Sequence, residues 1–208
     1  MTEKPVVADR PAGSDKRFIS AQSLLEDSFR LGAEILRSGF RPSYIVGVWR
    51  GGTPVGIAVQ ELLDHFGIPT DHIAIRTSSY LGIGKRDKHV RVHGLGYIVD
   101  RVDAGDGLLI VDDVYDSGLS IQAVIEQLRK RARRNCPGDI RVATPWFKPG
   151  NNKTERVPDY YLHETDRWLV FPHELQGLSD AEIIQGKPSI KPVFEFLRRD
   201  AAAVLDSS

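Results

Sequence analysis

The chain has 208 residues, 41% hydrophobic and 27% charged, which is enough for one α/β domain with a sizeable core. Basic and acidic residues both total 28, and this zero net charge excludes nucleic-acid binding through a bulk basic field. One cysteine excludes an intrachain disulfide, and apolar runs stay below the roughly 20 residues that span a membrane. We therefore expect a cytoplasmic protein without a signal peptide and without nucleic-acid or membrane partners.

The first segment of the chain predicts a flexible tail followed by a helix. Residues 1–16 are polar and contain two prolines and a glycine, which is typical of a loose terminus. Ser20 is a plausible N-cap, and apolar residues then recur at helical spacing as far as Leu36. The helix is expected to stop before Gly39.

A strand, a glycine loop and a helix follow in that order. Residues 44–49 are apolar and predict a core strand, and Pro54 suits the first turn of a helix that continues to Phe66. The loop between them contains Arg50 and Gly51. Backbone N–H groups and a fixed positive charge in such a loop can hold a pyrophosphate.

The next segment predicts a strand, a loop and two short strands. Residues 72–76 alternate as a strand, and residues 77–88, with two glycines and clustered charge, predict a mobile loop. Short apolar runs at residues 90–92 and 97–99 predict two further strands.

Residues 108–120 carry the strongest functional signal. Four apolar residues predict a strand buried on both faces, which is typical of a parallel sheet, and Asp112 and Asp113 follow it. A polar turn leads into a helix that starts near Leu119 or Ser120. The turn and the helix N-terminus supply donors for a phosphate, and the two acids supply acceptors for sugar hydroxyls. The predicted phosphate-binding residues are Asp116, Ser117, Gly118, Leu119 and Ser120.

The rest of the chain predicts one more core strand and a helical end. The helix closes on a basic run, residues 129–134, which we attribute to the helix dipole rather than to a nucleic-acid surface. A strand at residues 140–147 ends before Lys148, a polar loop covers residues 151–156, and residues 168–171 are apolar. Residues 177–208 predict one short and one longer helix, with Ser179 as a possible cap.

Residues 108–120 resemble the PRPP-binding motif of the type I phosphoribosyltransferases, where PRPP is 5-phosphoribosyl 1-pyrophosphate. The resemblance extends over about residues 44–174. It implies an α/β fold, an open, mostly parallel sheet with helices on both faces, together with a small hood lobe built from the two chain ends. The implied domain is residues 17–176, and residues 177–208 form a helical extension packed on it.

The resemblance also assigns roles to residues outside the motif. It places the pyrophosphate on Arg50 and Gly51, with a non-proline cis peptide at Trp49–Arg50, and it makes Ser78, Ser79 and Tyr80 part of a closing loop. Similarity to the xanthine–guanine and hypoxanthine enzymes narrows the acceptor to a purine. The implied purine-binding residues are Lys148, Trp168 and Leu169.

The implied reaction is transfer of the phosphoribosyl group from PRPP to N9 of hypoxanthine, guanine or xanthine, a purine-salvage step. Asp112 and Asp113 would bind the ribose hydroxyls, and Asp116 would act as general base. Arg50 and Mg²⁺ would stabilise the leaving pyrophosphate, with the metal near Glu174 and Asp112, directly or through water. The family resemblance also implies a dimer or tetramer.

Several alternatives remain open from the sequence alone. One is a non-enzymatic regulator that senses PRPP or a nucleotide on the same fold, and another is phosphoribosyl transfer to a different base. A receiver-type phosphoacceptor site also has paired acids after a buried strand, but there they follow the first strand of the domain. Without the motif, Asp112 and Asp113 would be a solvated acidic turn. The role of Trp49 stays unassigned.

Overall fold

The computed structural model describes residues 16–81 and 88–197. Contacts between Cα atoms divide the chain into a larger unit, Ser20–Asp166, and a smaller unit made of the segments on either side of it. No helix in the described ranges is long and apolar enough to cross a membrane.

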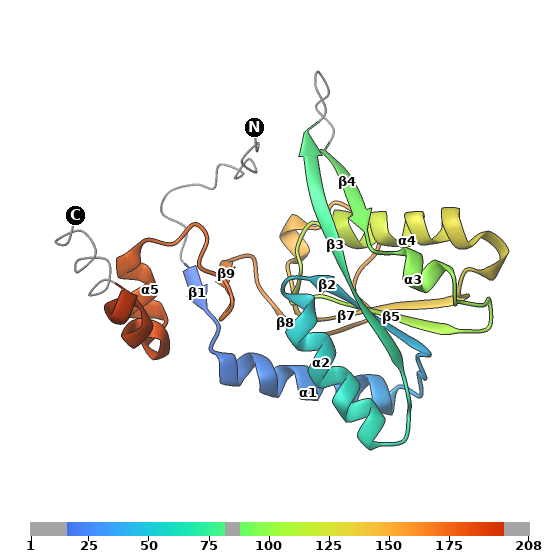
Figure 1. The fold of residues 1–208 in the computed structure, drawn as a ribbon, viewed down its shortest axis with the longest axis horizontal. Coiled ribbons are helices and arrows are strands. Elements are labelled where there is room, and N and C mark those ends of the chain that lie inside the picture. The colour runs from blue at the N-terminus through green and yellow to red at the C-terminus, as the bar shows by residue number, and fades with distance from the viewer. Residues whose placement is uncertain (1–15, 82–87, 198–208) are drawn as a thin grey trace. The chain divides into compact units, whose positions relative to one another are not determined.

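The larger unit is built on one mostly parallel sheet (Figure 1). The strand order is β4-β3-β2-β5-β7-β6, with β8 also paired to β7, and only the β3–β4 pair is antiparallel. The strands are β2 (Tyr44–Trp49), β3 (Asp71–Leu81), β4 (Lys88–His93), β5 (Gly107–Val111), β6 (Val114–Tyr115), β7 (Asp139–Phe147) and β8 (Tyr160–Glu164).

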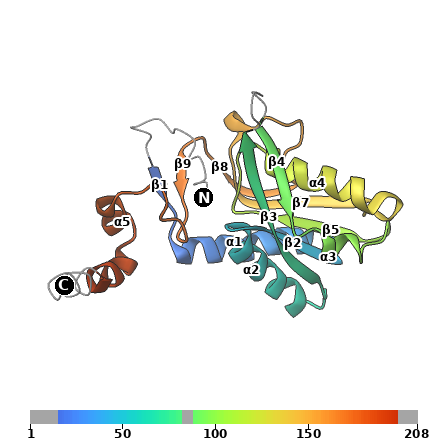
Figure 2. The same ribbon diagram turned by 45° about the horizontal axis from the view of Figure 1, so that its top comes forward.

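Helices cover both faces of this sheet (Figure 2). Helices α1 and α2 lie on one face and α4 on the other, which agrees with the helices on both faces that the family resemblance implies. These helices are α1 (Ala21–Arg37), α2 (Gly52–His65), the single turn α3 (Gly96–Val99) and α4 (Leu119–Ala132), which the 3₁₀ turn η1 (Arg133–Asn135) follows. Ser20 caps α1 by accepting a hydrogen bond from the N–H of Ser23, which confirms the predicted cap.

The main core lies between the sheet and the α3–α4 side. Its buried side chains come from β2, β5, β7 and α4, and include Val46, Leu108, Ile110, Val124, Leu128 and Val142. The four apolar residues of β5 are fully buried, as expected for a central parallel strand. Asp112 and Asp113 directly follow this buried strand, so the strand holds them at its carboxyl end.

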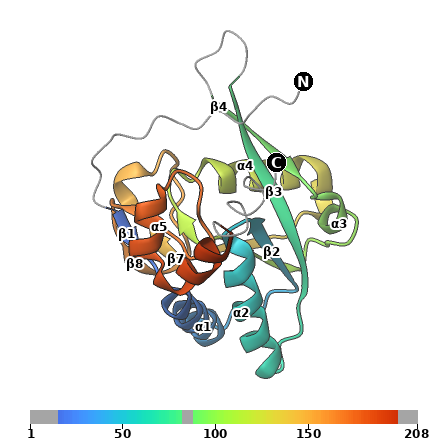
Figure 3. The ribbon, with the colours of Figure 1, turned by 60° about the vertical axis from the view of Figure 1, so that its left-hand side comes forward.

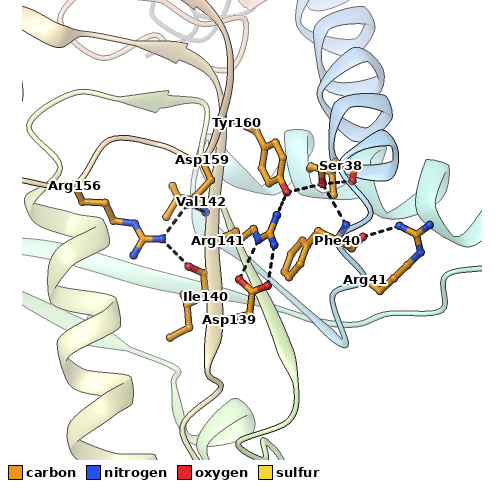
Figure 4. A network of polar contacts seen from close by, with 11 residues as sticks. Ser38, Phe40, Arg41, Asp139, Ile140, Arg141, Val142, Arg156, Asp159 and Tyr160 are labelled. Atoms are coloured by element: carbon orange, nitrogen blue, oxygen red, sulfur yellow. Dashed lines mark hydrogen bonds and ion pairs between the residues drawn. The ribbon is translucent and has the colours of Figure 1, made fainter.

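A polar network joins β7 and β8 to the end of α1 (Figure 4). The Arg141 guanidinium donates two hydrogen bonds to Asp139, both 3.0 Å long, and one to the Tyr160 hydroxyl. It also lies 4.4 Å from the ring centroid of Phe40. The Tyr160 hydroxyl is in turn 2.7 Å from Ser38 Oγ, so β7, β8 and α1 are joined at this end.

The smaller unit joins segments from the two ends of the chain. Its strand β1 (Lys16–Phe18) pairs in parallel with β9 (Trp168–Val170). The helix α5 (Asp180–Gly186) carries a capping box between Ser179 and Glu182, and Lys16 forms an ion pair with Glu182. The 3₁₀ turn η3 (Pro188–Ile190) and a helical segment at residues 191–197 complete the unit, of which Figure 3 shows β1 and α5.

Three predictions about local structure are wrong. Residues 97–99 lie in the helical turn α3, because a three-residue apolar run does not distinguish a strand from a buried helical turn. Residues 77–81 continue β3 by pairing with β4, so Ser78, Ser79 and Tyr80 lie in a strand. The rest of the predicted loop, residues 82–87, lies outside the described residues. Lys16 belongs to β1 rather than to the predicted tail, of which residues 1–15 also lie outside the described residues.

Candidate active site

The predicted PRPP-binding residues after β2 and β5 lie at a switch point, where two neighbouring strands lead into helices on opposite faces of the sheet. From β2 the chain crosses through α2 to β3, whereas from β5 it crosses through α4 to β7 on the other side. The neighbouring strands β2 and β5 therefore lead into helices on opposite faces, and the carboxyl ends of the strands at such a switch point are where open α/β sheets bind ligands. Arg50 and Gly51 follow β2, and the two aspartates follow β5.

The loop after β2 and the loop after β5 pack so closely that there is no room for a side chain on Gly51 or Gly52. A Cβ atom on Gly51 would lie 1.7 Å from Asp113 Oδ2, and one on Gly52 would lie 2.2 Å from the Val111 carbonyl oxygen. The glycine loop therefore presents its backbone directly beside the acidic pair. The predicted pyrophosphate loop and the predicted ribose-binding acids are thus brought together.

The Trp49–Arg50 peptide bond is cis, as the resemblance implies. Both side chains are exposed, and 54% of the Trp49 surface is accessible to solvent. The Arg50 guanidinium is therefore a fixed positive charge on an exposed loop beside Gly51, where it can meet an anionic ligand.

Burial and the neighbouring charge of Asp113 shift the pKa of Asp112. Burial raises the pKa of Asp112 well above its usual range, and the negative charge of Asp113 raises it further. Hydrogen bonds from the backbone N–H groups of Asp113, at 3.0 Å, and of Gly52 oppose this shift. The Asp113 side chain is nearly buried, at 8% exposure. Asp112 is partly exposed, so the pair offers carboxylate oxygens that can accept hydrogen bonds from hydroxyl groups.

The turn after the acidic pair, predicted to bind a phosphate, leads into the start of α4. Gly118 has a φ of 74°, a left-handed conformation that glycine adopts without strain, and α4 begins at the next residue. Ser117, Leu119 and Ser120 are all partly exposed there. The first N–H groups of a helix have no carbonyl partner within it, so they are available to an anion, and phosphate binding at this turn stays a prediction.

Lys148 joins this loop from the end of β7. Its side chain is only 7% exposed, and its Nζ atom lies 3.4 Å from Asp116 Oδ2. Asn151 Nδ2 donates to the other carboxylate oxygen of Asp116 at 3.0 Å. The buried Lys148 ammonium group and the Asp116 carboxylate therefore lie side by side at residues 116–120, the predicted phosphate loop.

Comparisons with known proteins agree with this geometry. The family model described as "Phosphoribosyl transferase domain" matches residues 19–176. The chain belongs to the phosphoribosyltransferase family.

Two curated relatives of this phosphoribosyltransferase are named hypoxanthine-guanine phosphoribosyltransferase. The one from Lactococcus lactis is 28% identical over 148 residues, covering 70% of this chain and 74% of the relative. The one from Bacillus subtilis is 25% identical over 178 residues, covering 85% and 91%. Among solved structures, a purine phosphoribosyltransferase from Pyrococcus horikoshii is 26% identical with a TM-score of 0.62, covering 80% of this chain and 98% of that chain.

The phosphate loop of this phosphoribosyltransferase has a brace that sequence analysis missed. The Lys153 N–H donates to the Ser117 carbonyl at 3.0 Å, and Thr154 Oγ1 lies 3.0 Å from the hydroxyl of the buried Tyr115. A Cβ on Gly118 would lie 2.6 Å from each of these two hydroxyl oxygens. The polar composition of residues 151–156 indicates a loop but gives no signal of where it packs.

The remaining predicted residues lie in the smaller unit or on β3. The Trp168 ring carries Lys16 Nζ 4.3 Å from its centroid, Leu169 is buried in β9, and Glu174 accepts a hydrogen bond from the Phe171 N–H at 3.1 Å. On β3, Ser78 Oγ lies 3.3 Å from His93 Nε2. Their assembly with the residues of the larger unit stays a prediction.

The donor set suits a metal ion that enters with its substrate. Within residues 16–81 and 88–197, no group of three or more His, Cys, Asp or Glu side chains could hold a metal ion. Asp112 and Asp113 supply one carboxylate pair beside the anion loops. Mg²⁺ is commonly held by one or two carboxylates, water and substrate phosphates, so the Asp112 carboxylate fits Mg²⁺ bound with a polyphosphate substrate.

Proposed function

We propose that this phosphoribosyltransferase transfers the 5-phosphoribosyl group from PRPP to N9 of a 6-oxopurine and releases pyrophosphate. The observation that carries the proposal is the pair of Lys148 and Asp116, 3.4 Å apart beside the phosphate loop. A 6-oxopurine presents O6 and N7 on one edge. Lys148 can only donate, so it matches O6 and mismatches the 6-amino group of adenine, while Asp116 can accept the N7 proton.

The chain's residues divide the work of the reaction. Residues 116–120 bind the 5′-phosphate, and Asp112 and Asp113 accept hydrogen bonds from the ribose hydroxyls and face the positive charge that develops at C1′. The bond from C1′ to pyrophosphate breaks with its electron pair leaving on pyrophosphate, and the N9 lone pair forms the new bond. Asp116 takes the N7 proton as this happens.

The leaving group is stabilised by the glycine loop. Arg50 and the Gly51 N–H face the pyrophosphate as it gains charge. When bound, Mg²⁺ would neutralise part of this charge, held by Asp112 directly or through water and by Glu174 of the smaller unit.

The smaller unit would complete the purine site. In this proposal Trp168 stacks on the base, the backbone of Leu169 reads the purine edge, and the strand with Ser78, Ser79 and Tyr80 carries a segment that closes over the reactants. Closure would exclude water from the reactive sugar.

Pyrophosphate release tests the function. The chain is incubated with PRPP, Mg²⁺ and, in parallel, hypoxanthine, guanine, xanthine, adenine, orotate or uracil. We expect release with one or more 6-oxopurines only. In Lys148→Met, the preference for the 6-oxopurine over adenine should fall at least roughly tenfold, since one unmatched buried polar group costs about 1–3 kcal/mol.

Two outcomes would contradict the proposal. Release only with adenine or a pyrimidine would keep the enzyme class and remove the role of Lys148. PRPP binding without release from any base would favour the sensing regulator instead.

A further inference from the structure

A groove of about 480 Å³ lies between α4 and the segment that braces the phosphate loop. One wall is a stripe of α4, and the other is residues 153–156. Its volume falls within the range of small-molecule sites, roughly 300–1,000 Å³. The lining residues are Gln122, Ile125, Glu126, Arg129, Lys153, Thr154, Glu155 and Arg156.

The charges in this groove suit an anion that also carries hydroxyl groups. Neither Arg129 nor Lys153 forms a side-chain ion pair within the part of the chain that the structure describes. Arg156 is held in place by the Ile140 carbonyl at 2.6 Å and Asp159 at 2.9 Å (Figure 4). Two cations on opposite walls can share a phosphate, and Glu126 and Glu155 can accept from hydroxyls.

We propose that this groove binds a sugar phosphate, free or as part of a nucleotide, as an effector of the phosphoribosyltransferase site. The regulatory part rests on the proposed function, because it requires PRPP at the phosphate loop. The two acidic side chains make a bare polyphosphate a poor ligand, since they repel added negative charge.

The groove is coupled to the phosphate loop through residues that belong to both. Lys153 lines the groove, and its N–H donates a hydrogen bond to the Ser117 carbonyl at 3.0 Å. Thr154 lines the groove and contacts Tyr115. A ligand that fixes this segment stabilises the phosphate loop in the conformation that a bound 5′-phosphate also favours. The two ligands therefore strengthen each other's binding.

Calorimetric titration of the full chain with UMP, and separately with ribose 5-phosphate, tests the site without turnover. UMP is not the product of transfer to a 6-oxopurine. We expect Arg129→Gln to weaken binding roughly tenfold, the loss of one charge-assisted hydrogen bond. Arg131→Gln is the matched control, because it removes the same charge about 200° around the helix and outside the groove. Its binding should equal that of the wild type.

The direction in which PRPP changes the Kd of the ligand distinguishes binding in the groove from binding in the active site. Saturating PRPP and Mg²⁺, without a base, should lower the Kd of the ligand at least about fivefold, and the ligand should lower the Kd of PRPP by the same factor. A Kd that PRPP raises would mean competition at the phosphate loop and would overturn the proposal. Equal binding by Arg129→Gln and wild type, or no binding of either ligand, would overturn it as well.

Failure of the proposed function gives a different result. A chain that releases no pyrophosphate with any base, yet binds UMP or ribose 5-phosphate through Arg129, retains the groove as a ligand site. A chain that catalyses transfer but whose Arg129→Gln variant binds both ligands like wild type retains the function and loses the groove.

Discussion

Because Gly51 has no side chain, the loop after β2 can pack closely against the acidic pair after β5. A methyl group there would lie 1.7 Å from Asp113 Oδ2, so Gly51→Ala must push the glycine loop and the acidic pair apart. We expect at least a tenfold loss of kcat/KM for PRPP and a fall of about 1–3 kcal/mol in the free energy of unfolding, the usual cost of overpacking. Pyrophosphate release and urea denaturation measure the two effects.

Gly105→Ala is the matched control, because a Cβ there would meet nothing within 4 Å. It should leave both quantities near the wild-type values. Wild-type kcat/KM in Gly51→Ala would show that the two loops can separate without harm to PRPP binding.

The acidic pair makes the stability of the protein depend on pH. The pKa of Asp112 is raised above its unfolded value by burial and by Asp113, so folding favours the protonated form. This contribution is fully present below the unfolded pKa, near 3.9, and is lost as the pH rises through the raised folded pKa. Ionisation of Asp112 therefore destabilises the fold.

Asp112→Asn removes this titration and should stabilise the protein at pH 7 while it lowers activity. Each unit of displaced pKa corresponds to about 1.4 kcal/mol. Urea denaturation of the variant and the wild type at pH 4 and pH 7 checks the sign. A variant that gains nothing at pH 7 relative to pH 4 would show that the burial of Asp112 does not penalise its charge.

At the level of the elements, hydrophobic patterning predicted most of the larger unit. Strand β5 and helix α4 follow from four apolar residues and a helical repeat, because burial on two faces leaves a direct mark on sequence. The turn α3 was missed because three apolar residues carry no period. The β1–β9 pairing was missed because it joins residues about 150 positions apart, and contacts at that distance have no local signal.

The site followed the same division. The acids, the phosphate loop and the cis peptide bond were predicted, because the motif specifies them locally. The brace by Thr154 was not, since a threonine in a polar loop has the same composition whether or not it contacts the core. The pairing of Lys148 with Asp116 depends on where β7 ends in space.

This brace can be tested as an element. Thr154→Val keeps the side-chain shape and removes the hydroxyl that contacts Tyr115 at 3.0 Å and Asn152 at 2.9 Å. The phosphate loop should loosen, so we expect the KM for PRPP to rise severalfold with little change in kcat, because about 0.5–1.5 kcal/mol is lost per hydrogen bond. Steady-state kinetics with varied PRPP measures this.

Thr70→Val is the matched control. The Thr70 hydroxyl is buried and has no hydrogen-bond partner within residues 16–81 and 88–197, so its replacement by a methyl group should leave the KM for PRPP unchanged and the stability equal or higher. Equal effects of the two substitutions on KM would argue against a brace at Thr154.

At the scale of the whole molecule, the candidate residues are shared between two units. The residues assigned to PRPP lie in Ser20–Asp166, except for Glu174, whereas Trp168 and Leu169 lie in the smaller unit. That unit depends on both chain ends, because β1 supplies the strand beside β9 and Lys16 lies over Trp168. In the proposed function, the two units therefore serve different substrates.

Trp168→Ala tests this division of substrates. Loss of a stacked aromatic ring costs about 1–3 kcal/mol per base, so the KM for hypoxanthine should rise roughly tenfold or more while the KM for PRPP stays within about twofold. Trp168→Phe should retain most of the affinity. A parallel rise of both KM values in Trp168→Ala would mean that this side chain supports the whole site rather than the base.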